Sequence, residues 1–316
     1  MKKILVTGSL GQIGSELVSE LRRRYGNENV VATDIRRNLR DKSDEGPYEY
    51  LDCLDPFQII DIVKKYNIDT VYHLAALLSA VAEAKPQDAW NVNVRGLFNI
   101  LEAARLYKLA IFTPSSIGAF GPSTPSVNTP QDTIQRPSSM YGVTKVAGEL
   151  LCDYYHTKFG VDTRGVRYPG IISHVAPPGG GTTDYAVNIF YDALQTGNFK
   201  CFLKEGTRLD MMYMPDALEA AIAVMEADPA KLLHRNAFNV TSMSFTPEMI
   251  AAEIRKHIPS FDMTYEVDPV RQGIADSWPD NMDDSSAREE WGWSPVYNLE
   301  TMTSDMLEKL RIKLKL

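Results

Sequence analysis

A glycine triplet follows the first run of apolar, β-branched residues in the chain. Residues 3–7 have the composition of a strand, and the sequence then reads Gly8-Ser9-Leu10-Gly11-Gln12-Ile13-Gly14. In a strand–turn–helix unit, the first glycine permits the tight turn and the second lets the backbone approach a pyrophosphate. The third lets the helix pack close to the sheet, with its N-terminal amides facing the phosphates. The spacing and its context predict a dinucleotide-binding turn.

The first 170 residues alternate short β-branched runs with amphipathic stretches. We expect strands at 3–7, 30–34, 70–75, 110–115 and 162–168, and helices at 12–24, 56–66, 88–106 and 141–159. Strands and helices that alternate at this spacing form a parallel sheet with helices on both faces. The prediction is an α/β fold with a doubly wound sheet of the Rossmann type.

The pattern changes after about residue 170, where residues 176–183 (Ala-Pro-Pro-Gly-Gly-Gly-Thr-Thr) form the strongest turn signal in the chain. We expect helices near 185–196, 215–227 and 246–257, with short strands near 201–203 and 238–240. Residues 1–170, with part of the 200–240 region, are predicted to form the nucleotide-binding domain. Residues 171–316 are predicted to form a smaller, mixed α/β substrate-binding cap, assembled from discontinuous segments.

Composition narrows the function classes. Of the 316 residues, 44% are hydrophobic and 23% charged, as in soluble globular proteins. The net charge of −8 argues against a nucleic-acid partner. The three cysteines and five histidines have no metal-ligand spacing, so no structural metal is expected. Without a leader or an apolar run of membrane-spanning length, we expect no membrane partner and a cytoplasmic protein, or the mature form of an imported one.

The second predicted strand ends at Asp34, twenty residues after Gly14. A carboxylate there accepts hydrogen bonds from both ribose hydroxyls and repels a 2′-phosphate, so NAD is expected rather than NADP. Arg36 and Arg37 follow and attract a 2′-phosphate, which leaves NADP open. A surface aspartate that caps a loop is the structural alternative.

Two further segments fit a bound dinucleotide. Asp52 and Cys53 fall where a third strand would end, close to an adenine. Leu74, Ala75 and Ala76 end the next strand, and small residues there leave room for the ribose on the nicotinamide side. Plain packing is the alternative for both segments.

The run Tyr141-Gly142-Val143-Thr144-Lys145 places a tyrosine and a lysine four residues apart at the start of a predicted helix. This spacing puts both side chains on one face. A fixed ammonium beside the phenol, together with an oxidised nicotinamide, favours the phenolate and makes it a usable base. Ser115 and Ser116 end the preceding strand, where a hydroxyl can orient the substrate oxygen. The alternative is a helix start with an edge tyrosine and a surface lysine.

Together these motifs resemble those of the extended short-chain dehydrogenases/reductases, the group that contains UDP-galactose 4-epimerase. The residues that carry the resemblance are Gly8, Gly11, Gly14, Asp34, Leu74, Ala75, Ala76, Ser116, Tyr141 and Lys145. The resemblance covers essentially the whole chain and implies that the serine, tyrosine and lysine are catalytic and that Ile171 contacts NAD. It also implies a homodimer, through a four-helix bundle of helices 88–106 and 141–159.

The segment from 209 to 216 departs from the nucleotide-sugar enzymes of this group. Those enzymes usually carry an arginine that neutralises the sugar nucleotide's diphosphate, and here Leu209 stands in its place. Arg208 is adjacent but points the other way if the segment is a strand. The group's usual Asn-x-Tyr-Gly-Pro is replaced by the run 167–173, Arg-Tyr-Pro-Gly-Ile-Ile-Ser. A diphosphate buried without a cation is strongly penalised, so a nucleotide sugar is disfavoured.

The replacement sequences resemble those of the short-chain-type L-threonine 3-dehydrogenases. They lie at 167–173, 178–186, 211–217 and 277–280. The resemblance implies that the Cβ hydroxyl of L-threonine is oxidised to L-2-amino-3-oxobutyrate, with hydride passing to NAD, in threonine catabolism. The alternatives are an NAD-dependent nucleotide-sugar epimerase or dehydratase and a non-catalytic NAD-sensing protein.

A small zwitterionic substrate makes chemical sense of several polar residues. Besides Ser116 and Tyr141, the expected substrate contacts are Ser79, Gly180, Gly181, Thr182, Thr183, Asp184 and Trp278. The glycines present amides to a carboxylate, the aspartate pairs with the ammonium, and the tryptophan closes the pocket. A flexible surface loop and a core tryptophan are the alternatives.

Overall fold

Six parallel strands form the central sheet of the computed structural model, which describes residues 1–36, 46–176 and 181–316. Their order is β3-β2-β1-β4-β5-β7, and every neighbouring pair is parallel. The strands are β1 (Ile4–Thr7), β2 (Val30–Asp34), β3 (Tyr48–Tyr50), β4 (Thr70–His73), β5 (Ala110–Phe112) and β7 (Asp162–Arg164). This is the strand order of a Rossmann fold, and the predicted fold class is confirmed.

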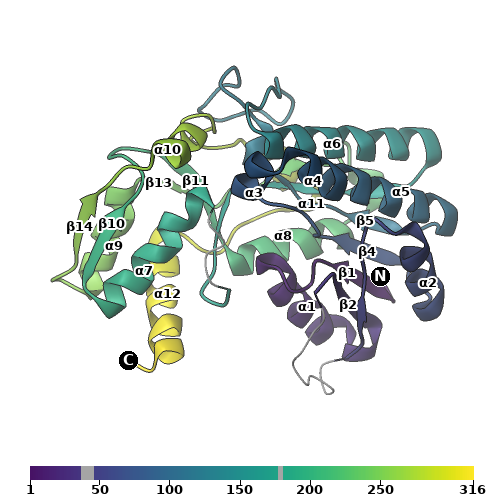
Figure 1. Cartoon of the computed structure of the whole chain (residues 1–316), viewed down its shortest axis with the longest axis horizontal. Coiled ribbons are helices and arrows are strands. Elements are labelled where there is room, and N and C mark those ends of the chain that lie inside the picture. Colours follow the sequence, from purple (N-terminus) through teal and green to yellow (C-terminus); the bar gives the residue numbers. More distant parts are fainter. Residues whose placement is uncertain (37–45, 177–180) are drawn as a thin grey trace.

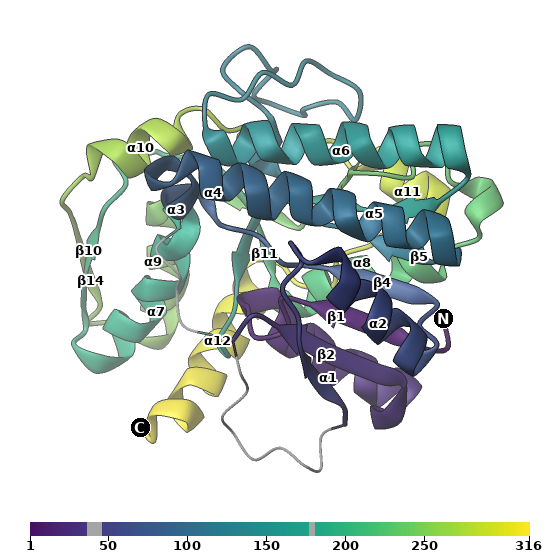
Figure 2. The ribbon, with the colours of Figure 1, turned by 45° about the vertical axis from the view of Figure 1, so that its right-hand side comes forward.

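Helices cover both faces of this sheet, as Figures 1 and 2 show. On one face the core is completed by α1 (Gln12–Tyr25), α8 (Met214–Glu226) and α11 (Ser285–Trp291). On the other it is completed by α2 (Pro56–Tyr66), α5 (Gly96–Tyr107) and α6 (Met140–Phe159). The short α3 (Ser79–Ala84) and α4 (Pro86–Trp90) lead into α5 through a π-helical turn, Asn91–Arg95. Single 3₁₀ turns occur at Asn27–Asn29, Ile117–Ala119, Thr182–Asp184 and Pro229–Lys231.

The described residues form three further, smaller sheets beyond the central one. The first joins β6 (Ser115–Ser116), β8 (Val166–Tyr168) and β12 (Phe238–Asn239). The second joins β9 (Gly170–Ile172), β11 (Leu209–Tyr213) and β13 (Met243–Phe245), and the third pairs β10 (Asn198–Cys201) with β14 (Asp262–Tyr265). The remaining helices are α7 (Tyr185–Gln195), α9 (Pro247–His257), α10 (Pro269–Ala275) and α12 (Leu299–Leu314).

Strand β11 takes part in two hydrophobic cores. Side chains alternate sides along a strand, and Met212 packs with α1 and α8 in the core of the central sheet. Its neighbours Met211 and Tyr213 pack instead with α7, α9 and α12 in a second core. The elements of this second core, which we call the cap, lie together at the left of Figure 1. No helix within the described ranges has the length and apolar character needed to span a membrane.

Two predicted strands are divided in the structure. The run at 110–115 becomes β5 and β6, and the run at 162–168 becomes β7 and β8, interrupted at Gly165. A Cβ at Gly165 would lie 2.4 Å from the Thr113 carbonyl oxygen, so this close crossing needs glycine. The chain changes partners there: β7 pairs with β5, whereas β8 pairs with β6 and β12.

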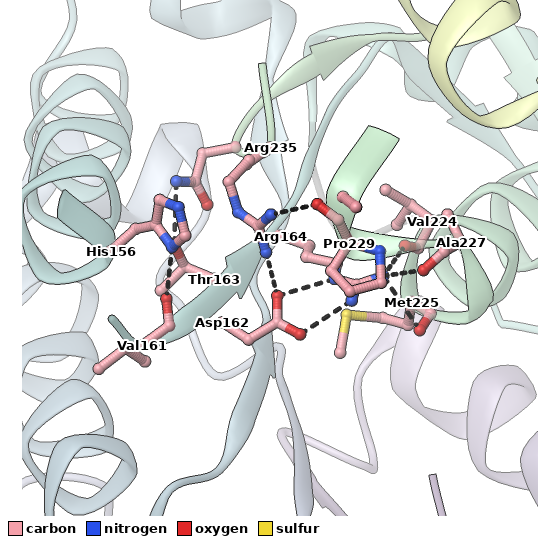
Figure 3. Close-up of polar contacts among 12 residues, drawn as sticks. His156, Val161, Asp162, Thr163, Arg164, Val224, Met225, Ala227, Pro229 and Arg235 are labelled. Carbon is pink, nitrogen blue, oxygen red and sulfur yellow. Dashed lines mark hydrogen bonds and ion pairs between the residues drawn. The ribbon is translucent and has the colours of Figure 1, made fainter. Parts of the chain in front are cut away.

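A polar cluster ties the end of α8 to β7 (Figure 3). Arg164 Nη1 donates to the carbonyl oxygens of Val224 and Ala227, both at 2.8 Å, while its other nitrogens bond to Asp162. Arg235 also pairs with Asp162, and it donates to the Pro229 carbonyl at 2.9 Å. The last carbonyls of a helix have no partner within the helix, and a buried arginine satisfies them here. The cluster therefore has a structural role.

Candidate active site

A cavity of ≈ 240 Å³ opens where the carboxyl ends of β1 and β4 face the cap. Ligands of doubly wound sheets bind at this edge. The predicted site residues that line it are Gly8, Gly11, Gln12, Ile13, Gly14, Leu74, Ala76, Ser79, Ser116, Tyr141, Lys145, Ile171, Gly181, Thr182, Thr183, Asp184 and Trp278. Lining residues that the sequence analysis did not assign as contacts are Leu78, Pro114, Ser115, Ile117, Tyr168, Pro169 and Gly170. The fold thus brings most of the predicted site into one place.

Four predicted residues do not line this cavity, and Gly180 lies outside the described residues. Asp52 accepts a hydrogen bond from the Leu54 amide at 2.9 Å in the turn after β3. Cys53 is buried, which raises the pKa of its thiol to about 11. Ala75 lies against the glycine turn, and Asp34 is described below.

The glycine turn has no space for side chains. Gly8 has a φ of +68°, and a Cβ there would lie 2.8 Å from the Ala75 nitrogen. A Cβ at Gly14 would lie 2.2 Å from the Gly8 carbonyl oxygen. The turn ends at Gly11, the N-cap of α1, whose first turn opens into the cavity. The backbone can therefore approach a pyrophosphate closely, and the site fits a dinucleotide.

Asp34 is buried at the end of β2, only 5% exposed. Its carboxylate accepts hydrogen bonds from the Leu10 amide at 3.1 Å and from the Arg36 amide at 3.0 Å. Arg36 Nε also donates to it at 3.0 Å. Burial alone would raise the pKa of this carboxyl, but the hydrogen bonds from Arg36 and Leu10 outweigh it and hold the pKa below its usual value. Asp34 is therefore an anion near neutral pH. Arg37 lies outside the described residues.

The proposed catalytic side chains meet around Gly118. Tyr141 lies in the first turn of α6, whose N-cap Ser139 accepts a hydrogen bond from the Gly142 amide at 3.1 Å. A Cβ at Gly118 would lie 3.3 Å from Tyr141 Cδ1 and 3.5 Å from Ser116 Oγ, so the ring and the hydroxyl flank the same small space. Lys145 Nζ lies 5.4 Å from the centre of the Tyr141 ring.

A backbone carbonyl binds the Lys145 ammonium, and a neutral histidine lies nearby. Lys145 Nζ donates to the Pro114 carbonyl at 2.7 Å. His73 is buried at the end of β4, where its Nδ1 lies 2.8 Å from Thr7 Oγ1. Burial and the positive charge of Lys145 lower the pKa of His73 to about 3. His73 is therefore uncharged near the lysine at neutral pH, a property that no local sequence pattern indicates.

A buried ion pair supports the strand end that carries Ser116. The Ser115 hydroxyl donates to the Glu149 carboxylate. Glu149 pairs with Arg167 at 2.8 Å, and both side chains are more than nine-tenths buried. Arg167 also donates to Asn239 Oδ1 at 3.1 Å, which links β8 to β12.

A hydrogen bond joins the two ends of the loop from Gly181 to Asp184. Asp184 accepts a hydrogen bond from the Gly181 amide at 2.6 Å and is buried. Thr183 packs against Gly170, where a Cβ would come within 2.9 Å of the Thr183 Cβ. Trp278 packs with Ile117, Phe120 and Met282, next to the turn that follows Ser116.

The segment at 208–209 brings no cation into the cavity. Leu209 is buried in the cap core. Arg208 is directed away, as expected, and donates to the Ser244 carbonyl at 2.8 Å on the surface.

A glycine turn that fits a pyrophosphate, opposite a tyrosine–lysine pair on a Rossmann sheet, is typical of an NAD-dependent oxidoreductase. The profile of the NAD dependent epimerase/dehydratase family matches residues 4–241, and the chain belongs to this family. The predicted cofactor, NAD, is confirmed.

Similar proteins align over nearly the whole chain. An uncharacterized epimerase/dehydratase of Staphylococcus haemolyticus is 57% identical, and the alignment covers 99% of each chain. The structure of L-threonine dehydrogenase from Clostridium difficile is 59% identical with a TM-score of 0.97, covering 99% of this chain and 98% of that one. A monomeric L-threonine 3-dehydrogenase from a metagenome is 44% identical with a TM-score of 0.94, covering 98% and 99%.

Proposed function

We propose that this protein oxidises the Cβ hydroxyl of L-threonine to L-2-amino-3-oxobutyrate in threonine catabolism. The observation that carries the proposal is the charge of the cavity wall: among the described residues, Lys145 is the one cation that lines it. A nucleotide sugar needs a further cation for its own diphosphate, whereas a small zwitterion does not. The similarity to L-threonine dehydrogenases over the whole chain supports the same substrate.

In the proposed mechanism, Tyr141 acts as the base. Its phenolate removes the proton of the substrate hydroxyl while Ser116 Oγ holds that oxygen, since both groups border the space around Gly118. Lys145 stabilises the phenolate electrostatically and binds the nicotinamide ribose. NAD, when bound, accepts the hydride from Cβ.

Cofactor contacts are assigned to the sheet half of the molecule. The glycine turn holds the pyrophosphate, Asp34 binds the adenine ribose, Asp52 and Cys53 lie toward the adenine, and Ile171 lines the nicotinamide end.

Substrate contacts are assigned to the cap and to the start of α3. The Thr182 and Thr183 hydroxyls, which line the cavity, are proposed to hold the amino acid carboxylate, with Ser79 opposite. Asp184 orients this loop through its bond to Gly181 and adds negative charge near the ammonium. Trp278 excludes water from the reacting carbon.

We also propose a cytoplasmic homodimer that pairs the α5 and α6 faces of two copies. The two helices pack side by side on the outside of the sheet in Figures 1 and 2. They leave large apolar side chains exposed along this face: Phe98, Leu106, Val143, Leu150 and Tyr154. Several large apolar side chains exposed on neighbouring helices typically mark a protein interface.

The substrate assignment is tested by incubating the purified protein with NAD and a substrate panel. The panel contains L-threonine, D-threonine, L-allo-threonine, 3-hydroxybutyrate and UDP-sugars, and NADH formation is followed. We expect rapid NADH formation with L-threonine. Activity confined to another member of the panel would overturn the substrate. Interconversion of a UDP-hexose by protein that retains stoichiometric NAD would identify an epimerase instead.

A further inference from the structure

The acceptor capacity of Asp34 is filled from within the chain. A carboxylate offers about four lone-pair positions. Oδ2 accepts from the Leu10 amide at 3.1 Å and from Arg36 Nη2 at 3.2 Å. Oδ1 accepts from the Arg36 amide and from Arg36 Nε, both at 3.0 Å. A ribose that binds to this carboxylate must therefore replace a donor that is already present.

The four donors differ in how easily they leave. The two backbone amides belong to the glycine turn and to the end of β2, and Tyr48 also fixes the backbone there by donating to the Arg36 carbonyl. The Arg36 guanidinium is at the end of a side chain that is 61% exposed. It can rotate into solvent without moving the backbone. The guanidinium thus occupies the positions that the ribose hydroxyls need.

From this geometry we infer that Arg36 is a specificity-determining residue that competes with the adenine ribose for Asp34. Its competition weakens NAD binding. In NADP binding the same guanidinium stands beside the 2′ position and offsets the repulsion between Asp34 and the 2′-phosphate. Arg36 therefore narrows the preference for NAD over NADP that Asp34 creates. The inference rests on the proposed role of Asp34 in ribose binding.

The test measures dissociation constants of NAD and NADP directly by isothermal titration, without turnover. Arg36→Gln removes the competing guanidinium. An ion pair with one exposed partner contributes up to roughly fivefold to an equilibrium constant. We expect NAD to bind about three- to fivefold more tightly and NADP at least threefold more weakly. Arg36→Lys keeps the positive charge but cannot donate two parallel hydrogen bonds to Asp34. It should therefore raise the affinity for NAD and leave the affinity for NADP unchanged.

Arg23→Gln is the matched control, because it removes the same charge from an exposed arginine in the last turn of α1. It should leave both constants unchanged. Unchanged or weaker NAD binding by Arg36→Gln overturns the inference, as does NADP binding that does not change.

The variant Asp34→Ala distinguishes a failure of the inference about Arg36 from a failure of the role proposed for Asp34 in binding the ribose. If Asp34→Ala leaves NAD affinity unchanged, the assigned role of Asp34 is wrong and the inference fails with it. If Asp34→Ala weakens NAD binding but Arg36→Gln does not strengthen it, the inference alone fails.

Discussion

Arg167 and Glu149 form a buried ion pair directly behind the strand end that carries Ser116, with 2.8 Å between Nη2 and Oε2. Glu149 also accepts the Ser115 hydroxyl, so the pair supports the residue next to Ser116. A buried charge that loses its partner is penalised heavily, whereas the intact pair contributes little net stability.

Arg167→Met should therefore lower the free energy of unfolding by about 3–5 kcal/mol, measured by urea denaturation. The matched control is Arg23→Met, which breaks the exposed pair with Glu20. Arg23→Met should lower the free energy of unfolding by less than about 1 kcal/mol. Similar values for the two variants would show that the buried pair is not structurally important.

Tyr141→Phe removes the proposed base but keeps the ring. We expect turnover of L-threonine to fall by about 10²–10⁴-fold, because general-base assistance is lost, while NAD affinity stays within about twofold. Stopped-flow measurement of NADH formation and a separate binding titration distinguish the two effects. Tyr265→Phe, at an exposed tyrosine of β14 in the cap, should change neither. Retained turnover in Tyr141→Phe contradicts the mechanism.

Gly14→Ala tests the glycine turn. The added Cβ would lie 2.2 Å from the Gly8 carbonyl oxygen, so the turn must shift and its amides lose their alignment with the pyrophosphate. We expect NAD affinity to fall about tenfold or more in a binding titration. Gly273→Ala in α10 meets no atom within 4 Å and serves as the control. Normal NAD binding by Gly14→Ala would count against the assignment of this turn.

Asp210 provides a pH-dependent prediction. It accepts hydrogen bonds from the Met282 amide and the Thr241 hydroxyl, and burial raises its pKa to about 7. The unfolded chain releases this proton near pH 4, so the stability that the protonated form contributes is lost as pH rises from about 4 to 7. Asn at this position can accept from the Met282 amide through Oδ1 and donate through Nδ2 to the Thr241 hydroxyl oxygen, and it does not titrate.

The stability gained by Asp210→Asn should therefore be larger at pH 8 than at pH 5, by about 1–3 kcal/mol in urea denaturation. Asp276→Asn, at a half-exposed carboxylate, is the control for the loss of one negative charge from the surface. A gain from Asp210→Asn that does not vary with pH would exclude titration of Asp210 as its cause.

The proposed dimer is tested by charge insertion on α6. Leu150 is exposed on the apolar face of that helix, so Leu150→Asp should yield monomers in sedimentation experiments at concentrations where the unmodified protein is dimeric. Leu233→Asp alters an even more exposed leucine elsewhere and should not dissociate the dimer. A monomeric unmodified protein would refute the dimer outright.

Local spacing explains why much of the site was predictable. The glycine turn and the Tyr141/Lys145 pair are each contained within seven residues, and short-range geometry determines what they can do. The strand break at Gly165 was not predictable, because it depends on the Thr113 carbonyl far away in sequence.

Contacts between residues that are distant in the sequence also explain why two residues around the site, His73 and Glu149, could not be predicted. His73 acquires its role from burial beside Lys145, and Glu149 from its pairing with Arg167. Helices α10 and α11 have seven residues each, too few to display a helical period. The start of helix α12 could have been predicted from its N-cap, because Asn298 is a typical capping residue and its side chain accepts a hydrogen bond from the Thr301 amide.

Strand β11 constrains how this molecule can evolve. Met212 completes the core of the central sheet, and Leu209, Met211 and Tyr213 complete the core of the cap, so both cores depend on one strand. A recombination event that replaced the cap with another one would have to supply a strand fitting both hydrophobic environments at once. New substrates are therefore reached more readily by changing residues around the cavity than by exchanging the cap as a module.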